Sequence, residues 1–330
     1  MARPIIVVNS LSKNGYVTCA ITVALLAQDS AIRTNVHLVL VPATVTSRRG
    51  DLIDGLTADD FIVTDDGVPQ KVRLDTSDTV LAPVSLVVLV QASGISTPAL
   101  ARIRQVGPMM QPLVIGERGQ AAVIAYDDEL RTYLQFTSDG TNIRKAFEEI
   151  QPRTIKQAKL IDAVIEGMKM LDTRKENYRR IMLVLGESRD RGSKHKLAEA
   201  VELAQRAGVV IYFLTYSAEG QAWTSSADDD PSMPGDADYI GAIKEVSRLA
   251  TKNDANAFAR TTGGRHLSFL TEKSLEAAIS RLGQEVHSQY LLSFVPTDTK
   301  NTGMHRIQVK LVKFPTVVVR ARPAYWPERQ

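Results

Sequence analysis

The chain has 330 residues, of which 44% are hydrophobic and 23% are charged. This is the composition of an ordinary globular protein, and it excludes a disordered or membrane-embedded chain. The 40 Lys and Arg residues barely outnumber the 37 Asp and Glu residues. Nucleic-acid binding requires clustered positive charge, so we expect no nucleic-acid partner.

Residues 1–27 have the pattern of a secretory signal peptide. Arg3 and Lys13 are the only charged side chains before Asp29, and the apolar stretch YVTCAITVALLA, residues 16–27, follows them. This order is typical of a cleaved leader, and the stretch is too short to cross a bilayer core of about 30 Å. We therefore expect an exported mature chain that lacks the only cysteine, Cys19, and has no stable membrane span. A buried N-terminal strand or helix is the alternative.

Residues 28–80 are predicted to be β-rich. A strand is expected over residues 36–45 and a second over 61–65. The dipeptide Asp66-Gly67 is a strong hairpin signal, so residues 70–74 are expected to form the returning strand.

Residues 81–287 alternate between predicted strands and helices. A strand over 85–90 precedes a helix over 98–110, and another helix is expected over 272–287. Between them, TNIRKAFEEI, AKLIDAVIEGMKML and KLAEAVELAQRAG have the apolar spacing of amphipathic helices. Residues 217–238 fit neither period and are expected to form a long loop. The alternation predicts a doubly wound, mostly parallel sheet.

Residues 288–330 are again β-rich, with QYLLSFVP, HRIQVKLV and PTVVVRARPAYW as strand candidates. Neither flank contains enough strands to be stable alone. We therefore predict that strands from the two ends of the chain pair in a small β-sandwich that flanks the α/β domain.

Several segments resemble, in order and spacing, successive elements of a von Willebrand factor type A domain: LVVLVQASGIS, RGQAAVIAYDD, AKLIDAVIEG, RRIMLVLGESRDRGS and VVIYFLTY. The two flanks resemble the type A-related exported proteins of acidobacteria. The resemblance implies a Rossmann-like doubly wound fold and a role in protein binding, adhesion or assembly at the bacterial envelope.

The resemblance also implies a metal-ion-dependent adhesion site on the top face, where the carboxyl ends of the strands lie. Its five ligand positions fall on Gln91, Ser93, Ile95, Ala158 and Glu187. A hard divalent cation requires oxygen ligands that include carboxylates, and here one carboxylate and two hydroxyls are replaced. We expect a degenerate site without a bound cofactor. Weak binding of Mg²⁺ or Mn²⁺ through Ser93 and Glu187 is the alternative, and an ammonium from Lys156 or Lys159 beside Glu187 is a further one.

Two loops of opposite charge are expected on the same face and form the candidate partner-binding surface. The basic loop contributes Arg189, Arg191, Lys194 and Lys196, and the acidic loop contributes Trp223, Asp228, Asp229 and Asp230. Either the acidic loop docks on the basic one and shapes a surface for a protein partner, or both loops are solvated.

An enzymatic role has weaker support. Gly186-Glu187-Ser188-Arg189-Asp190 lies between a predicted strand and helix, as a nucleophile elbow does, but Asp190 replaces the final glycine. The five histidines are scattered, and none forms an evident pair with a carboxylate. The sequence contains no phosphate-binding glycine loop and no zinc-ligand spacing. We therefore predict a non-enzymatic protein, with an envelope serine hydrolase that uses Ser188 as the alternative.

Overall fold

The computed structural model describes residues 38–75, 82–174, 178–216, 253–297, 301–313 and 316–327. The predicted leader and the predicted acidic loop, with Trp223, Asp228, Asp229 and Asp230, lie outside these ranges. Among the described helices, none combines the length and the apolar character that a membrane span requires.

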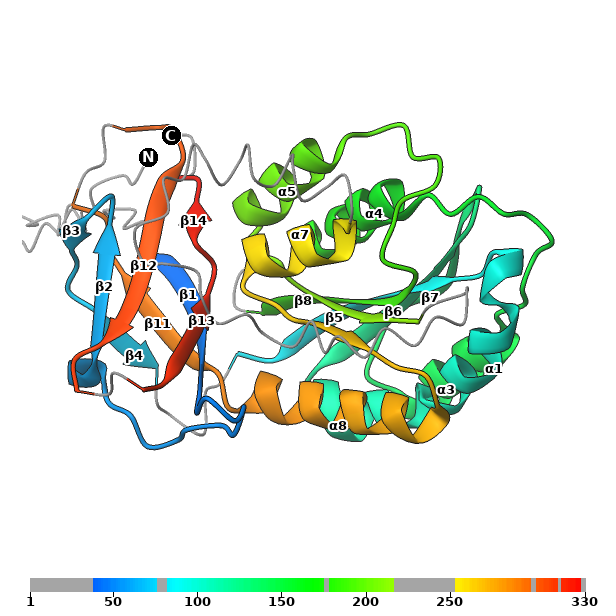
Figure 1. The fold of residues 1–330 in the computed structure, drawn as a ribbon, viewed down its shortest axis with the longest axis horizontal. Coiled ribbons are helices and arrows are strands. Elements are labelled where there is room, and N and C mark those ends of the chain that lie inside the picture. The colour runs from blue at the N-terminus through cyan, green and yellow to red at the C-terminus, as the bar shows by residue number, and fades with distance from the viewer. Residues whose placement is uncertain are drawn as a thin grey trace, which may run out of the picture. The chain divides into compact units, whose positions relative to one another are not determined.

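A six-stranded sheet forms the centre of the α/β region (Figure 1). Its strands, in sheet order, are β10 (His266–Ser268), β9 (Val210–Thr215), β8 (Arg179–Gly186), β5 (Val84–Gln91), β6 (Gln120–Tyr126) and β7 (Leu130–Thr137). All neighbours are parallel except β6 and β7. From β5 the chain adds β6 and β7 on one side, and it then adds β8, β9 and β10 on the other side. This is the strand order of a doubly wound sheet. The predicted fold class is confirmed.

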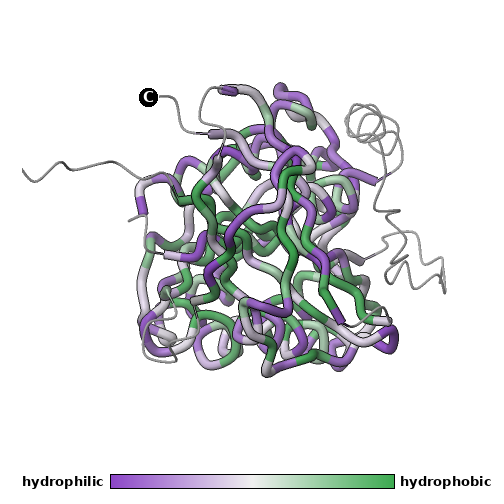
Figure 2. Tube along the Cα trace, turned by 90° about the vertical axis from the view of Figure 1, so that its left-hand side faces the viewer, coloured by the Kyte–Doolittle hydropathy of each residue, from purple (hydrophilic) through white to green (hydrophobic). Residues whose placement is uncertain are grey.

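Helices cover both faces of this sheet, as Figure 1 shows. One face is covered by α1 (Thr97–Gln105), α3 (Gly140–Glu149) and α8 (Glu272–His287), and the other by α4 (Leu160–Asp172), α5 (Leu197–Arg206) and α7 (Asp254–Thr262). Because both faces are covered, every residue of β5 is buried. Val88 packs into one core and Val87 into the other. The apolar segments therefore run through the interior, with hydrophilic residues gathered at the outer turns (Figure 2).

The predicted helix over 98–110 is wrong in its extent. Helix α1 ends at Gln105, and a short turn α2 (Gly107–Met109) and a π-helical segment η3 (Met110–Ile115) follow. Pro108 lacks the N–H that would continue the ladder of α1. Gly107 lies against α3, where an added Cβ would come 2.9 Å from the Cβ of Phe147. The prolyl break and this close contact divide the helix.

Two four-stranded sheets form the β-sandwich. One contains β13 (Val318–Ala321), β1 (Val39–Thr46), β11 (Tyr290–Phe294) and β4 (Arg73–Asp75); the other contains β14 (Ala324–Tyr325), β12 (His305–Leu311), β2 (Phe61–Asp65) and β3 (Val68–Pro69). Strand β1 pairs with β11, and β2 with β12, both antiparallel. Val41, Val63, Leu292 and Ile307 share one core. Strands from the two ends of the chain therefore pair, as predicted.

The hairpin at Asp66-Gly67 forms, but its return strand does not run as predicted over residues 70–74. Asp66 and Gly67 have φ of 48° and 84°, as a type I′ turn requires. Strand β3 pairs with β2, whereas β4 pairs with β11 in the other sheet. The Gln70 N–H still donates to Val63 O at 2.9 Å, and the chain then crosses to the second sheet. A short 3-10 turn, η1 (Ala58–Asp60), precedes β2.

Buried charges connect α8 to the sandwich. Glu285 of α8 is buried, and its carboxylate pairs with Arg265, at 3.4 Å from Nε, and with Arg320 of β13. The Arg206 guanidinium of α5 lies 4.0 Å from the centre of the Trp326 ring, which follows β14. Contacts of this kind hold the two halves of the sandwich against the α/β region.

Candidate functional site

The loops that follow β5 and β8 meet at the point where the strand order reverses. Strand β5 ends at Gln91, and β8 ends at Gly186, followed by Glu187. Ser93 precedes the 3-10 turn η2 (Gly94–Ser96). In open α/β sheets the crevice outside the carboxyl ends at this point is the usual ligand site. The topology thus brings Gln91, Ser93 and Glu187 together, and all three are buried.

The Gln91 carboxamide joins the two loops. Its Oε1 accepts a hydrogen bond from the Glu187 backbone N–H at 2.7 Å. Its Nε2 donates to Ser93 Oγ at 2.9 Å and to Glu187 Oε2 at 3.4 Å. Ser93 Oγ and Glu187 Oε2 are also the ligand atoms that would be available to a cation at this position. A neutral amide therefore connects the groups that a metal would connect in a site with intact ligands.

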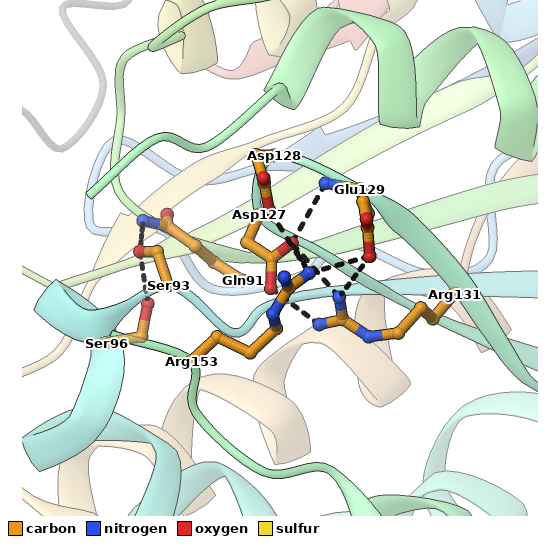
Figure 3. Close-up of polar contacts among 8 residues, drawn as sticks. All are labelled: Gln91, Ser93, Ser96, Asp127, Asp128, Glu129, Arg131 and Arg153. Atoms are coloured by element: carbon orange, nitrogen blue, oxygen red, sulfur yellow. Dashed lines mark hydrogen bonds and ion pairs between the residues drawn. The ribbon is translucent and has the colours of Figure 1, made fainter. Parts of the chain in front are cut away.

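A second hydroxyl comes from Ser96. Ile95, at the predicted position of the second serine ligand, offers no oxygen from its side chain, but the buried Ser96 Oγ lies 3.2 Å from Ser93 Oγ (Figure 3). In a 3-10 turn the side chains of residues i and i+3 eclipse, which places these two hydroxyls side by side. We did not predict Ser96; its spacing of three from Ser93 is the only sequence signal for it.

Arg191 balances the charge of Glu187. Its Nε lies 3.3 Å from Glu187 Oε2, and an NH2 donates to Oε1 at 3.4 Å. Within the described residues, neither Lys156 nor Lys159 forms an ion pair with Glu187. The counter-ion therefore comes from the basic loop.

Ala158, at the predicted threonine position, is buried and pairs with Arg191 through the backbone in both directions, at 3.0 and 2.8 Å. The segment that would supply a hydroxyl therefore supplies only a methyl group. It also fixes the Arg191 backbone, so the side chain that neutralises Glu187 starts from a defined position.

The floor of the site is tightly packed and uncharged. A Cβ at Gly186 would lie 2.4 Å from the Tyr126 hydroxyl and 2.9 Å from Gln91 Oε1, so a larger residue here would displace these two side chains. Burial raises the pKa of the Tyr126 and Tyr216 phenols well above the usual value. Both remain neutral and add no anionic ligand.

A cluster of ion pairs lies in the turn between β6 and β7. Asp127 is fully buried, and Arg131 binds both its carboxylate oxygens, at 2.6 and 3.1 Å. Burial opposes ionisation of Asp127, but the hydrogen bonds from Arg131 overcome this and lower the pKa of the carboxyl. Arg153 reaches Glu129 at 2.7 Å and Asp128 at 3.2 Å (Figure 3). The Arg153 backbone N–H donates to Ala92 O at 2.8 Å, so this unpredicted cluster braces the loop after β5.

The basic loop is exposed and ordered by carboxylates. Arg189, Arg191, Lys194 and Lys196 are all exposed. Asp162 of α4 accepts from the Lys194 backbone N–H at 3.1 Å and from His195 Nδ1 at 2.8 Å. No pair of a histidine with a carboxylate is evident in the sequence, but His195 and Asp162, 33 positions apart, meet in the structure. The predicted contact with the acidic loop falls outside the described residues.

Ser188 lies in the same segment and is partly exposed. Its carbonyl accepts from the Ala255 N–H at 3.1 Å, and the Asp190 N–H donates to Asp254 at 2.7 Å. These bonds tie the segment to the start of α7. In the part of the chain that the structure describes, no hydrogen bond joins Ser188 to a histidine.

No protein-family model matches the chain, and no curated protein matches it. Its structure resembles that of the protein BatB from Bacteroides thetaiotaomicron, with 13% identity over 62% of this chain and 100% of that one and a TM-score of 0.45. It also resembles an aerotolerance-related membrane protein from Bacteroides fragilis, with 17% identity over 62% and 98% of the two chains and a TM-score of 0.43.

A von Willebrand factor type A protein from Catenulispora acidiphila shares 10% identity, over 90% of this chain and 64% of that one, with a TM-score of 0.47. Von Willebrand factor type A domains are thus among the structures that the chain resembles. The doubly wound class itself rests on the strand order of the six-stranded sheet.

Proposed function

We propose that this chain is an exported, non-enzymatic protein-binding module related to von Willebrand factor type A domains, which works at the bacterial envelope without a metal on its top face. The bonding of Gln91 carries this proposal. Its amide satisfies Ser93 and Glu187, and Arg191 neutralises the one carboxylate among these groups. A partner therefore meets protein side chains on this face instead of an open coordination position.

The exposed charge on this face favours an acidic partner segment. Arg191, Lys194 and Lys196 of the basic loop are exposed, and Lys156 from the loop before α4 is exposed as well. Clustered charges on a binding face accelerate encounter with a partner of opposite charge and help to select it. The leader pattern of residues 1–27 supports export, so the partner is expected to be an envelope protein.

The test is capture of partners from an envelope extract of the producing cells by the immobilised full chain. The top-face variant Lys156→Glu/Lys196→Glu should lose about tenfold or more of the captured protein, because like charges then oppose an acidic segment. The control, Lys145→Glu/Lys169→Glu, changes the net charge equally on the exposed surfaces of α3 and α4 and should capture as wild type does. Equal loss in both variants, or loss in neither, would contradict a binding site on the top face.

A further inference from the structure

A separate polar cluster lies in the β-sandwich, where β2 ends and β12 begins. His305 Nδ1 is 2.9 Å from Asp65 Oδ1 and 3.3 Å from Asp66 Oδ2, and the three side chains can offer ligand atoms within 4.8 Å of one another. Bonds of about 2.0–2.2 Å place neighbouring ligand atoms about 2.8–3.1 Å apart in octahedral geometry and about 3.3–3.6 Å apart in tetrahedral geometry. The separations measured from the imidazole nitrogen are thus close to those of a metal-ligand set.

In each of these side chains, the polar atom that does not face the other two forms a hydrogen bond with a residue outside the cluster. His305 Nε2 donates to the Asn301 carbonyl at 3.1 Å, and the Tyr325 hydroxyl donates to Asp65 Oδ2 at 2.9 Å. The Arg306 backbone N–H donates to Asp66 Oδ1 at 2.9 Å. Hydrogen bonds of this kind orient metal ligands in proteins. They leave Nδ1 of His305 and one oxygen of each aspartate facing one another, within 4.8 Å.

Burial and charge define the class of cation. The side chains of His305 and Asp65 are 1% and 3% exposed, whereas that of Asp66 is 46% exposed. Two carboxylates and a neutral imidazole carry a charge of −2, which matches a divalent ion, and the solvent side at Asp66 leaves room for water or for a ligand from a partner. An imidazole nitrogen favours zinc-like transition metals over Mg²⁺ and Ca²⁺.

We propose that Asp65, Asp66 and His305 form a binding site for a divalent transition metal of the zinc class. Binding replaces the proton on His305 Nδ1 with the metal and releases that proton to solvent. The ion then ties β2 to β12, strands about 240 positions apart in the sequence. This site is independent of the top face and of the function proposed for it.

The test uses the untagged full chain with Cys19→Ser, which removes the only thiol. Co²⁺ is titrated by its visible absorption, and Zn²⁺ by calorimetry. One equivalent should bind, and Asp66→Asn should weaken the binding at least about tenfold, as loss of a ligand or its support does. His195→Ala, which removes a surface histidine paired with Asp162, is the matched control and should bind as the parent does.

Asp66→Asn leaves the contacts of Asp65 with His305 and Tyr325 in place, so it is expected to fold even if His305→Ala does not. The proposal is overturned by an absence of binding at millimolar Co²⁺. It is equally overturned by an unchanged Kd in Asp66→Asn, or by loss of binding in His195→Ala.

Discussion

Replacing Gln91 with leucine should lower the free energy of unfolding by about 3–5 kcal/mol, since each buried polar group left without a partner costs about 1–3 kcal/mol. Leucine fills a similar volume but can neither accept from the Glu187 N–H nor donate to Ser93 and Glu187. The buried Glu187 N–H would then lose its acceptor, while Ser93 and the Glu187 carboxylate would keep only Ser96 and Arg191 as partners. Urea unfolding of wild type and variant at neutral pH measures the difference.

Ser93→Ala is the matched control for this prediction, because it removes one of the partners of the amide and leaves the bond to the Glu187 N–H intact. It should cost only about 1 kcal/mol. A Gln91→Leu variant that loses no more than Ser93→Ala would mean that the carboxamide does not hold the two loops together.

Lowering the pH from about 6.5 to about 4 should destabilise the protein by about 3 kcal/mol through His266 alone. Burial lowers the pKa of this histidine from 6.5 to about 4. Nδ1 donates to the Asn256 side-chain oxygen at 2.8 Å, and in the neutral ring Nε2 accepts from the Thr215 hydroxyl at 2.7 Å.

The direction follows from proton binding. The unfolded chain takes up a proton on this histidine below about pH 6.5, but the folded protein does so only below about pH 4, so stability is complete at neutral pH and falls between these values. His266→Gln removes the titrating ring. Its unfolding free energy should therefore fall less steeply than that of wild type over this interval in urea titrations. Parallel curves would show that the ring does not have the lowered pKa.

The sequence predicts the elements whose burial pattern is simple. The unbroken apolar run at residues 86–90 requires cover on both faces, and β5 has it. Asp66-Gly67 accommodates positive φ, and the turn forms there. The helix predicted over 272–287 is α8, with Thr271 as its N-cap. In each case a local property of the chain decides the structure.

Contacts between distant segments could not be predicted in this way. Neither the partner of Glu187 nor the switch of β4 to the second sheet has a local signal. His305 meets Asp65 across about 240 positions, and no spacing rule for metal ligands reaches that far. The predicted ligand positions show which metal ligands the top face lacks. They do not show that Gln91 and Arg191 satisfy the two remaining groups, Ser93 and Glu187.

The most direct test of a metal-free top face is thermal unfolding of the full chain in millimolar Mg²⁺ and in chelator. It is made with Asp66→Asn, so that metal binding at the sandwich cluster is weakened. We expect the same midpoint in both, because the amide of Gln91 and the guanidinium of Arg191 already satisfy Ser93 and Glu187. A cation at about a hundred times its Kd would add about 2.7 kcal/mol. A rise in Tm of about 5–10 °C with Mg²⁺ would therefore contradict the account.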